Sequence, residues 1–189
     1  MDDELIIERI RGGEGEAFSL LVNDHIFTAY KVSYLVLGTR EYAEDAVQNA
    51  LFDAYLSITK GYPIKNFKTW FLRLVYNRSV DLYRSNKRKS YMVFEDNYYS
   101  DEKTKSIQEM LIQNENKQEI SNLLHKLDID QRLPLLLYYF EEMSLKEISI
   151  VLNVNLNTLK SRLKRGKRKI SQLIKMEDRS SLEVKTYEL

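Results

Sequence analysis

The side chains of this sequence that are best placed to do chemistry are basic, and they gather in two blocks. Residues 62–92 hold eight bases against one acid, and residues 156–175 hold eight bases and no acid. The flanking stretches are acidic: residues 1–59 have eleven acids and four bases, and residues 93–119 have seven acids and three bases, so the formal net charge is only +1. One such block is more typical of a solvated helix face. Two blocks, each on an expected helix, favour two surfaces that bind a polyanion.

The C-terminal block lies in a stretch with the form of a helix-turn-helix. Ser144 and Glu147 have the spacing of a capping box that begins a short helix, and the turn Asn153-Val154-Asn155 leads into a second helix. In such motifs the second helix enters the major groove of duplex DNA, where its outward side chains contact base edges and its Lys and Arg contact phosphates. We favour DNA binding over an ordinary amphipathic helix. The candidate contacts are Asn157, Thr158, Lys160, Ser161, Arg162, Lys164, Arg165, Lys167 and Arg168.

The N-terminal block mixes bases with aromatic residues, among them Phe67, Trp70 and Tyr83. Aromatic faces stack on unpaired bases while basic side chains hold the backbone, so this composition suits single-stranded DNA. For Trp70 alone, a place in the core at helical spacing is the favoured interpretation. The candidate contacts are Tyr62, Lys65, Asn66, Phe67, Lys68, Trp70, Arg73, Asn77, Arg78 and Arg84.

Other chemistry finds little support in the composition. The chain has no cysteine, which excludes disulfides and thiol chemistry, and its two histidines are His25 and His125. A histidine-rich metal centre is therefore not expected. A metal-dependent nuclease would have to use carboxylates such as Asp45, Asp53 or Asp81, and we regard this as the weakest alternative. The acidic N-terminus and the lack of a long apolar run predict a soluble, cytoplasmic protein.

The elements that must position these side chains are predicted to be helices, since the chain has only two prolines and six glycines. Apolar spacing predicts helices over residues 3–10, 14–37, 40–59, 66–87, 107–127, 130–140, 144–152 and 156–175. Asp130 is expected to be an N-cap, with Pro134 in the first turn after it. The polar, tyrosine-rich stretch 89–104 reads as a linker. The predicted fold is all-α, with two small helical domains joined by a flexible linker and a helix-turn-helix in the second.

Both halves of the chain resemble the extracytoplasmic-function sigma factors, small members of the bacterial sigma-70 family. Residues 42–55 and 67–84 are similar to that family's pattern of Ala-Glu-Asp, Val and Gln followed by Phe-x-x-Trp, Asn, Asp and Arg. Residues 127–168 resemble its helix-turn-helix, carried by Asp130-Gln131-Arg132, by Ser144 with Glu147-Ile148, and by Asn157 to Leu163. Asn155 and Asn157 replace a frequent proline and glycine, and Asn49 replaces a frequent glutamate.

The resemblance implies a non-enzymatic protein that binds core RNA polymerase, directs it to promoters and helps melt the −10 element. It therefore implies no catalytic residue, no metal and no cofactor. It assigns residues 1–90 to sigma region 2, 91–117 to an acidic flexible linker, 118–178 to sigma region 4 and 179–189 to a C-terminal tail. Polymerase binding falls to Asp45, Gln48 and Asn49, the −10 element to the first block and the −35 element to the second. The implied partners are core polymerase, promoter DNA and an anti-sigma factor, often membrane-bound. A stand-alone helix-turn-helix regulator is the alternative.

Overall fold

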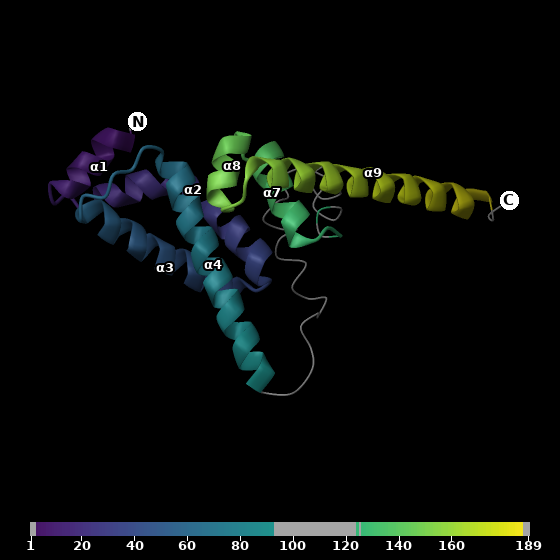
Figure 1. Cartoon of the computed structure of the whole chain (residues 1–189), viewed down its shortest axis with the longest axis horizontal. Helices are drawn as coiled ribbons and strands as arrows, with labels where there is room; N and C mark the ends of the chain where they lie inside the picture. The colour runs from purple at the N-terminus through teal and green to yellow at the C-terminus, as the bar shows by residue number, and fades with distance from the viewer. Residues whose placement is uncertain (1–2, 93–123, 125, 187–189) are drawn as a thin grey trace. The chain divides into compact units, whose positions relative to one another are not determined.

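The regular structure of this protein is entirely helical where the structure describes it. The computed structural model describes residues 3–92, 124 and 126–186, and its elements in these ranges are helices (Figure 1). They are α1 (Asp3–Arg11), α2 (Ala17–Leu37), α3 (Arg40–Thr59), α4 (Phe67–Met92), α7 (Ile129–Tyr139), α8 (Leu145–Val151) and α9 (Leu156–Thr186). The all-α prediction is confirmed. Within the described ranges, none of these helices combines the length and apolar character needed to cross a membrane.

The chain divides into two compact units. Among described residues, 3–92 and 146–154 fall in the first unit, and the rest fall in the second. The first unit thus includes α8 except for Leu145, although residues 118–178 were predicted to form one domain. The predicted domain boundaries therefore remain a prediction. The linker proposed at 91–117 lies outside the described residues except for its first two, as does most of the helix proposed at 107–127.

Three helices, α2, α3 and α4, pack pairwise in the first unit, and α1 covers α2 and α3. Helix α3 contributes small residues to this core, including Ala46, Ala50 and Ala54, while α4 contributes Phe67 and Phe71. Small side chains on one helix let the bulky ones of its neighbour fill the space between them, which keeps the interior close-packed. The exposed sides of α3 and α4 are thereby held in a defined relation.

A buried polar contact joins α2 to α4 in that core. The hydroxyl oxygens of Ser33 and Ser79 lie 2.6 Å apart, and both residues are fully buried. The Ser79 hydroxyl donates its proton to the carbonyl of Val75 at 2.7 Å. Because a serine has one hydroxyl proton, Ser33 is then the donor to Ser79.

The helix ends follow from local side-chain chemistry. Gly38 ends α2 in the left-handed conformation at φ 74°, where its N–H donates to the Tyr34 carbonyl. Thr39 caps α3, its hydroxyl accepting from the amide of Tyr42 at 3.3 Å. The side-chain oxygen of Asn66 accepts from the amide of Thr69 at 2.9 Å, as an N-cap does at the start of α4.

The second unit is built on the packing of α7 against α9. Helix α7 buries Leu133, Pro134 and the three leucines that follow, and α9 buries Leu159 and Leu163. Asn155 caps α9, since its side-chain oxygen accepts from the Thr158 amide at 2.8 Å. Asparagine at this position is therefore compatible with the turn.

Three details of the predicted helices are wrong. The N-cap of α7 is Asp128, without a side-chain cap bond, and Asp130 lies in the first turn. Pro134 lies inside α7 beyond its first turn, where its missing N–H leaves one carbonyl of the turn before without its helical partner. Helices α4 and α9 run on to Met92 and Thr186, past the expected ends, because residues 88–92 and 176–186 contain no glycine or proline.

Candidate nucleic-acid interface

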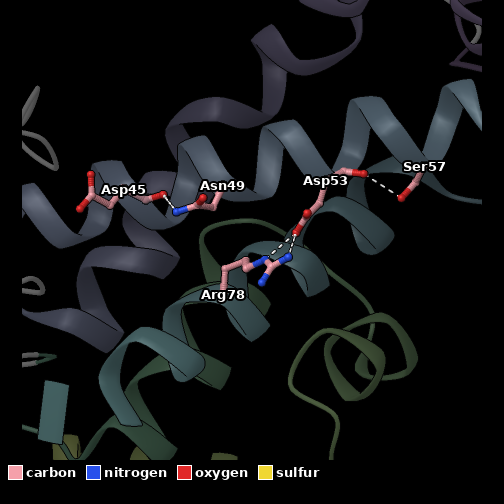
Figure 2. A network of polar contacts seen from close by, with 5 residues as sticks. All are labelled: Asp45, Asn49, Asp53, Ser57 and Arg78. Atoms are coloured by element: carbon pink, nitrogen blue, oxygen red, sulfur yellow. Dashed lines mark hydrogen bonds and ion pairs between the residues drawn. The ribbon is translucent and has the colours of Figure 1, made fainter. Parts of the chain in front are cut away.

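One side of α3 carries an exposed polar surface. Asp45, Gln48 and Asn49 are all exposed, while the neighbouring Ala46 and Ala50 are buried. The side-chain nitrogen of Asn49 donates to the carbonyl of Asp45 at 2.8 Å (Figure 2). This part of α3 therefore presents the Asp45 carboxylate and two amides, on a helix that packs in the core.

The same side of α3 holds an aromatic residue that sequence reasoning missed. Phe52 is 64% exposed and follows Gln48 and Asn49 at helical spacing. An exposed phenylalanine beside polar groups is a common composition for a protein-binding surface. The signal was available in the sequence, since Phe52 lies outside the apolar positions that pack α3.

An ion pair ties α3 to α4. The Arg78 guanidinium donates through Nε to Asp53 Oδ2 and forms an ion pair with the same oxygen through Nη2 (Figure 2). The hydrogen bond to Asp53 raises the pKa of Arg78 above its ordinary value. Arg78 was predicted to contact the −10 element, but here it is committed to Asp53. Its partner could not be found from sequence, because the two residues lie on different helices.

The exposed stripe of α4 consists of Arg73, Asn77 and Arg84, with Trp70 half-buried at its start. These residues recur at intervals of three, four and seven positions, which brings them to one side of the helix. Arg73 has no ion-pair partner among the described residues. The stripe thus places two cations and an amide along one line, beside an aromatic ring.

The predicted role of Phe67 is corrected by its burial. It is 1% exposed, stacks on Phe71 with ring centroids 5.5 Å apart, and packs against Trp70 and His25. A buried ring cannot stack on a base, so Phe67 belongs to the core. Trp70 fits both the core and the stacking interpretation, since it packs against Phe67 and remains partly exposed.

The loop before α4 displays the remaining residues of the first block. Tyr62 is 58% exposed, and Lys65 and Asn66 are also exposed, whereas Lys68 is half-buried. The guanidinium of Arg11, on α1, donates to the Tyr62 carbonyl at 2.8 Å. The backbone of this loop is therefore fastened to α1 while the Tyr62 ring stays accessible.

Helix α9 presents a second exposed face. Asn157, Ser161, Lys164 and Arg168 recur at intervals of three or four and are exposed, with Arg165 alongside. Lys160 and Lys167 lie at one edge of this face, and Lys167 sits over the Tyr139 ring, 5.1 Å from its centroid. The hydrogen bond between Lys167 and Tyr139 raises the pKa of that lysine, which keeps it charged.

Two predicted contacts on α9 lie at the opposite edge and turn towards the protein. Thr158 is half-buried, and its amide is held by the cap at Asn155. Arg162 is 19% exposed and donates to Asp130 of α7 at 3.0 Å. The expectation that Arg162 points outwards is therefore wrong, because Asp130 draws it to the side.

The acids proposed for a metal-dependent nuclease do not converge. Asp45 is exposed on α3, Asp53 is bound to Arg78, and Asp81 is exposed on α4. Among the residues that the structure describes, no group of three or more His, Cys, Asp or Glu could hold a metal ion.

Comparison with known proteins identifies two family models in the order expected from the motifs. Residues 21–89 match the model "Sigma-70 region 2", and residues 117–170 match "Sigma-70, region 4". The ECF RNA polymerase sigma factor SigW of Bacillus subtilis (strain 168) is 28% identical over 169 residues, covering 85% of this chain and 90% of SigW.

Two solved structures share the fold. The structure of CnrH in complex with the cytosolic domain of CnrY matches with a TM-score of 0.65 at 22% identity, covering 92% of this chain and 97% of CnrH. RpoE in complex with the anti-sigma factor NepR, from Bartonella quintana, matches with a TM-score of 0.64 at 20% identity, covering 84% and 96%. With two sigma-70 family models matched in order, the chain belongs to the sigma-70 family, and it is similar to extracytoplasmic-function members of that family.

Proposed function

We infer that this protein is a sigma factor: it binds core RNA polymerase, directs it to specific promoters and helps melt the −10 region. The observation that carries this conclusion is the match to sigma regions 2 and 4 in order along one chain. A stand-alone helix-turn-helix regulator would account for the second match and leave the first, over residues 21–89, without a purpose.

The exposed side of α3 is the proposed contact with core polymerase. Asp45 offers a full negative charge, and Gln48 and Asn49 offer amide groups that both donate and accept hydrogen bonds. Small buried residues on the opposite side hold α3 firmly against α2 and α4. The surface is therefore presented by a rigid element, which keeps the cost of ordering it on binding low.

The stripe on α4 and the loop before it are the proposed site for the melted −10 strand. Arg73 and Arg84 are placed to hold phosphates at two separate points of the strand, since they lie about 16 Å apart along α4, and Asn77 between them is placed to hydrogen-bond a base or sugar. The exposed ring of Tyr62 offers a stacking surface for an unpaired base. Lys65 and Asn66 extend the site towards that loop, and Phe67 supports it from the core.

The exposed face of α9 is the proposed −35 contact. Lys164, Arg165 and Arg168 supply positive charge along one side of the helix, and Asn157 and Ser161 supply uncharged hydrogen-bonding groups near its N-terminus. This division suits base reading by the first turns of the helix and phosphate binding further along.

The domain organisation follows the same assignment as a proposal. Residues 1–90 form region 2, 118–178 form region 4, 91–117 connect them and 179–189 form the tail. The excess of acids over residues 93–119 suggests that the connection imitates a nucleic-acid chain when it lies in polymerase channels.

The chemistry of RNA synthesis belongs to the polymerase, so we assign this chain no catalytic residue and no cofactor. Since it acts with polymerase on promoter DNA, we place it in the cytoplasm. CnrH and RpoE were solved with CnrY and the anti-sigma factor NepR respectively, which supports an anti-sigma factor as a further partner of this chain.

The decisive experiment is transcription in vitro with purified core polymerase on a promoter library. The full chain should produce initiation at defined sites, and core alone should not. A variant with Asp45→Arg and Gln48→Ala should lose co-purification with core while keeping its helical circular dichroism. Asp24→Arg, a charge reversal at an exposed position of α2, is the matched control and should retain association. Unchanged co-purification of the double variant would remove α3 from the polymerase interface.

A further inference from the structure

Helix α9 approaches α7 most closely at Gly166. A Cβ atom at this position would lie 2.8 Å from Leu135 Cδ1 and 3.3 Å from Gln131 Cβ, both on α7. Real Cβ atoms essentially never come as close as the first distance. Any other residue here would force either the Leu135 side chain or the helices themselves to shift, so Gly166 marks the point where α9 and α7 approach most closely.

Two ion pairs flank this crossing point. One turn before Gly166, Arg162 Nη2 lies 3.0 Å from Asp130 Oδ2, and one turn after it, Lys169 Nζ lies 3.4 Å from Asp128 Oδ2. Both aspartates come from the N-terminal end of α7, and both basic residues lie on the same edge of α9.

The three contacts add to the apolar packing of Leu159 and Leu163 in fixing how α9 is rotated about its own axis. Turning the helix towards α7 or away from it would separate both ion pairs, and it would bring a larger side chain than Gly166 to the crossing point. The rotation of α9 decides which residues form its exposed face, namely Asn157, Ser161, Lys164 and Arg168. The aspartates of α7 thus act on that face without belonging to it.

We propose that Asp130, acting through Arg162, is a positioning residue for promoter recognition, with Asp128 and Lys169 as a second point of support. This inference rests on the proposed function, in which the exposed face of α9 binds the −35 duplex. Asp130 holds Arg162 against α7 and so prevents the Arg162 guanidinium from contacting DNA phosphates. Recognition is thereby left to the exposed face.

Loss of the pair has two effects that can be separated from simple instability. Freeing Arg162 adds an unpaired cation beside the DNA, which should strengthen binding to any duplex and make it more dependent on salt. Loosening the rotation of α9 should weaken the preference for one sequence. The ratio of the affinity for the preferred sequence to the affinity for an unrelated duplex is therefore the quantity that reports positioning.

The test uses holoenzyme assembled from core RNA polymerase and the full chain. A −35 duplex is selected from a random library by wild-type holoenzyme, and fluorescence anisotropy measures its dissociation constant and that of a scrambled duplex. Asp130→Asn should lower the ratio of the scrambled to the selected dissociation constant about two- to fivefold, the size of one exposed ion pair. Asp130→Glu, which keeps the charge, should restore most of the ratio. Asp24→Asn, which removes a charge from α2, should leave it unchanged.

The coupling to Arg162 is tested by a double variant. In an Arg162→Gln chain, Asp130→Asn should change the ratio no further, because the pair is already absent. The inference would be overturned if Asp130→Asn left the ratio unchanged, or if Asp130→Glu lowered it as much as Asp130→Asn does. It would also be overturned if Asp130→Asn lowered the ratio by the same factor in the Arg162→Gln chain as in the wild-type chain. Wild-type holoenzyme that selects no −35 sequence would overturn the proposed function itself, so the two failures are distinguishable.

Discussion

Two arginines of the first basic block are predicted to behave differently when each is replaced by alanine. Arg73 is exposed on the stripe of α4 and has no ion-pair partner among the described residues, whereas Arg78 is paired with Asp53 of α3. Arg73→Ala should therefore weaken binding of the −10 strand and leave stability unchanged. Arg78→Ala should lower stability and have little direct effect on the strand.

The magnitudes follow from the two environments. Loss of one phosphate contact to a single strand should make the slope of log K against log salt less steep by about 0.7 for Arg73→Ala. The side chains of Arg78 and Asp53 are 46% and 26% exposed, so solvent screens their attraction and the pair contributes only about 0.5–1 kcal/mol. For a unit of this size that corresponds to a fall of about 2–8 °C in Tm.

The assay measures anisotropy of a labelled −10 single strand with holoenzyme over a potassium chloride series, together with thermal unfolding of the free chain. Arg78→Lys is the matched control, since it keeps the charge and removes the guanidinium geometry. If Arg78→Ala flattened the salt dependence as much as Arg73→Ala, Arg78 would be a phosphate contact. The assignment of Arg78 to the pair with Asp53 rather than to the strand would then be refuted.

Three further predictions concern the packing that holds these surfaces. Ser79→Ala leaves the buried Ser33 donor without its partner and should lower the free energy of unfolding in urea by about 1–3 kcal/mol. Removing the other hydroxyl, with Ser33→Ala, should lower it by only about 0.5–1.5 kcal/mol. Gly166→Ala should overpack the crossing of α7 and α9 and cost about 1–3 kcal/mol, with partial recovery when Leu135→Val is added. Burial raises the pKa of Tyr30 above its ordinary 10.0, and its hydroxyl is buried without a hydrogen-bond partner among the described residues. The stability due to the protonated Tyr30 hydroxyl is present below pH 10.0 and is lost as pH rises through the raised pKa. Tyr30→Phe should remove that loss without destabilising the protein at neutral pH. Urea unfolding at neutral pH and at a pH above 10.0 would show both effects.

The helical framework and the exposed faces could be predicted from the sequence because both depend on local spacing. Gly38 and Thr39 mark a helix junction by their own conformational preferences, and Asn66 marks the next start. Asp45 and Gln48 lie at the edge of an alanine-rich stripe, and their exposure follows from helical geometry alone.

What the sequence could not predict depends on neighbours that are distant along the chain. Phe67 has the composition of a stacking residue, and only the packing of Phe71, Trp70 and His25 around it shows that it is buried. The close approach at Gly166 is likewise invisible without the helix it meets.

The charge of the second basic block overstates what is available to DNA, and this can be measured. Lys169 is paired with Asp128 at 3.4 Å, and Arg162 is paired with Asp130, whereas Lys164 is exposed and has no ion-pair partner among the described residues. A cation that already has a carboxylate beside it releases no counterion from DNA unless that pair is broken. Lys164→Gln should therefore make the salt slope for −35 duplex binding by holoenzyme less steep by about 0.9, and Lys169→Gln should leave it nearly unchanged. The two substitutions remove the same charge from the same helix, so each is the control for the other. Equal changes in slope would show that the ion pairs of α7 open on DNA and that the whole block contacts phosphate.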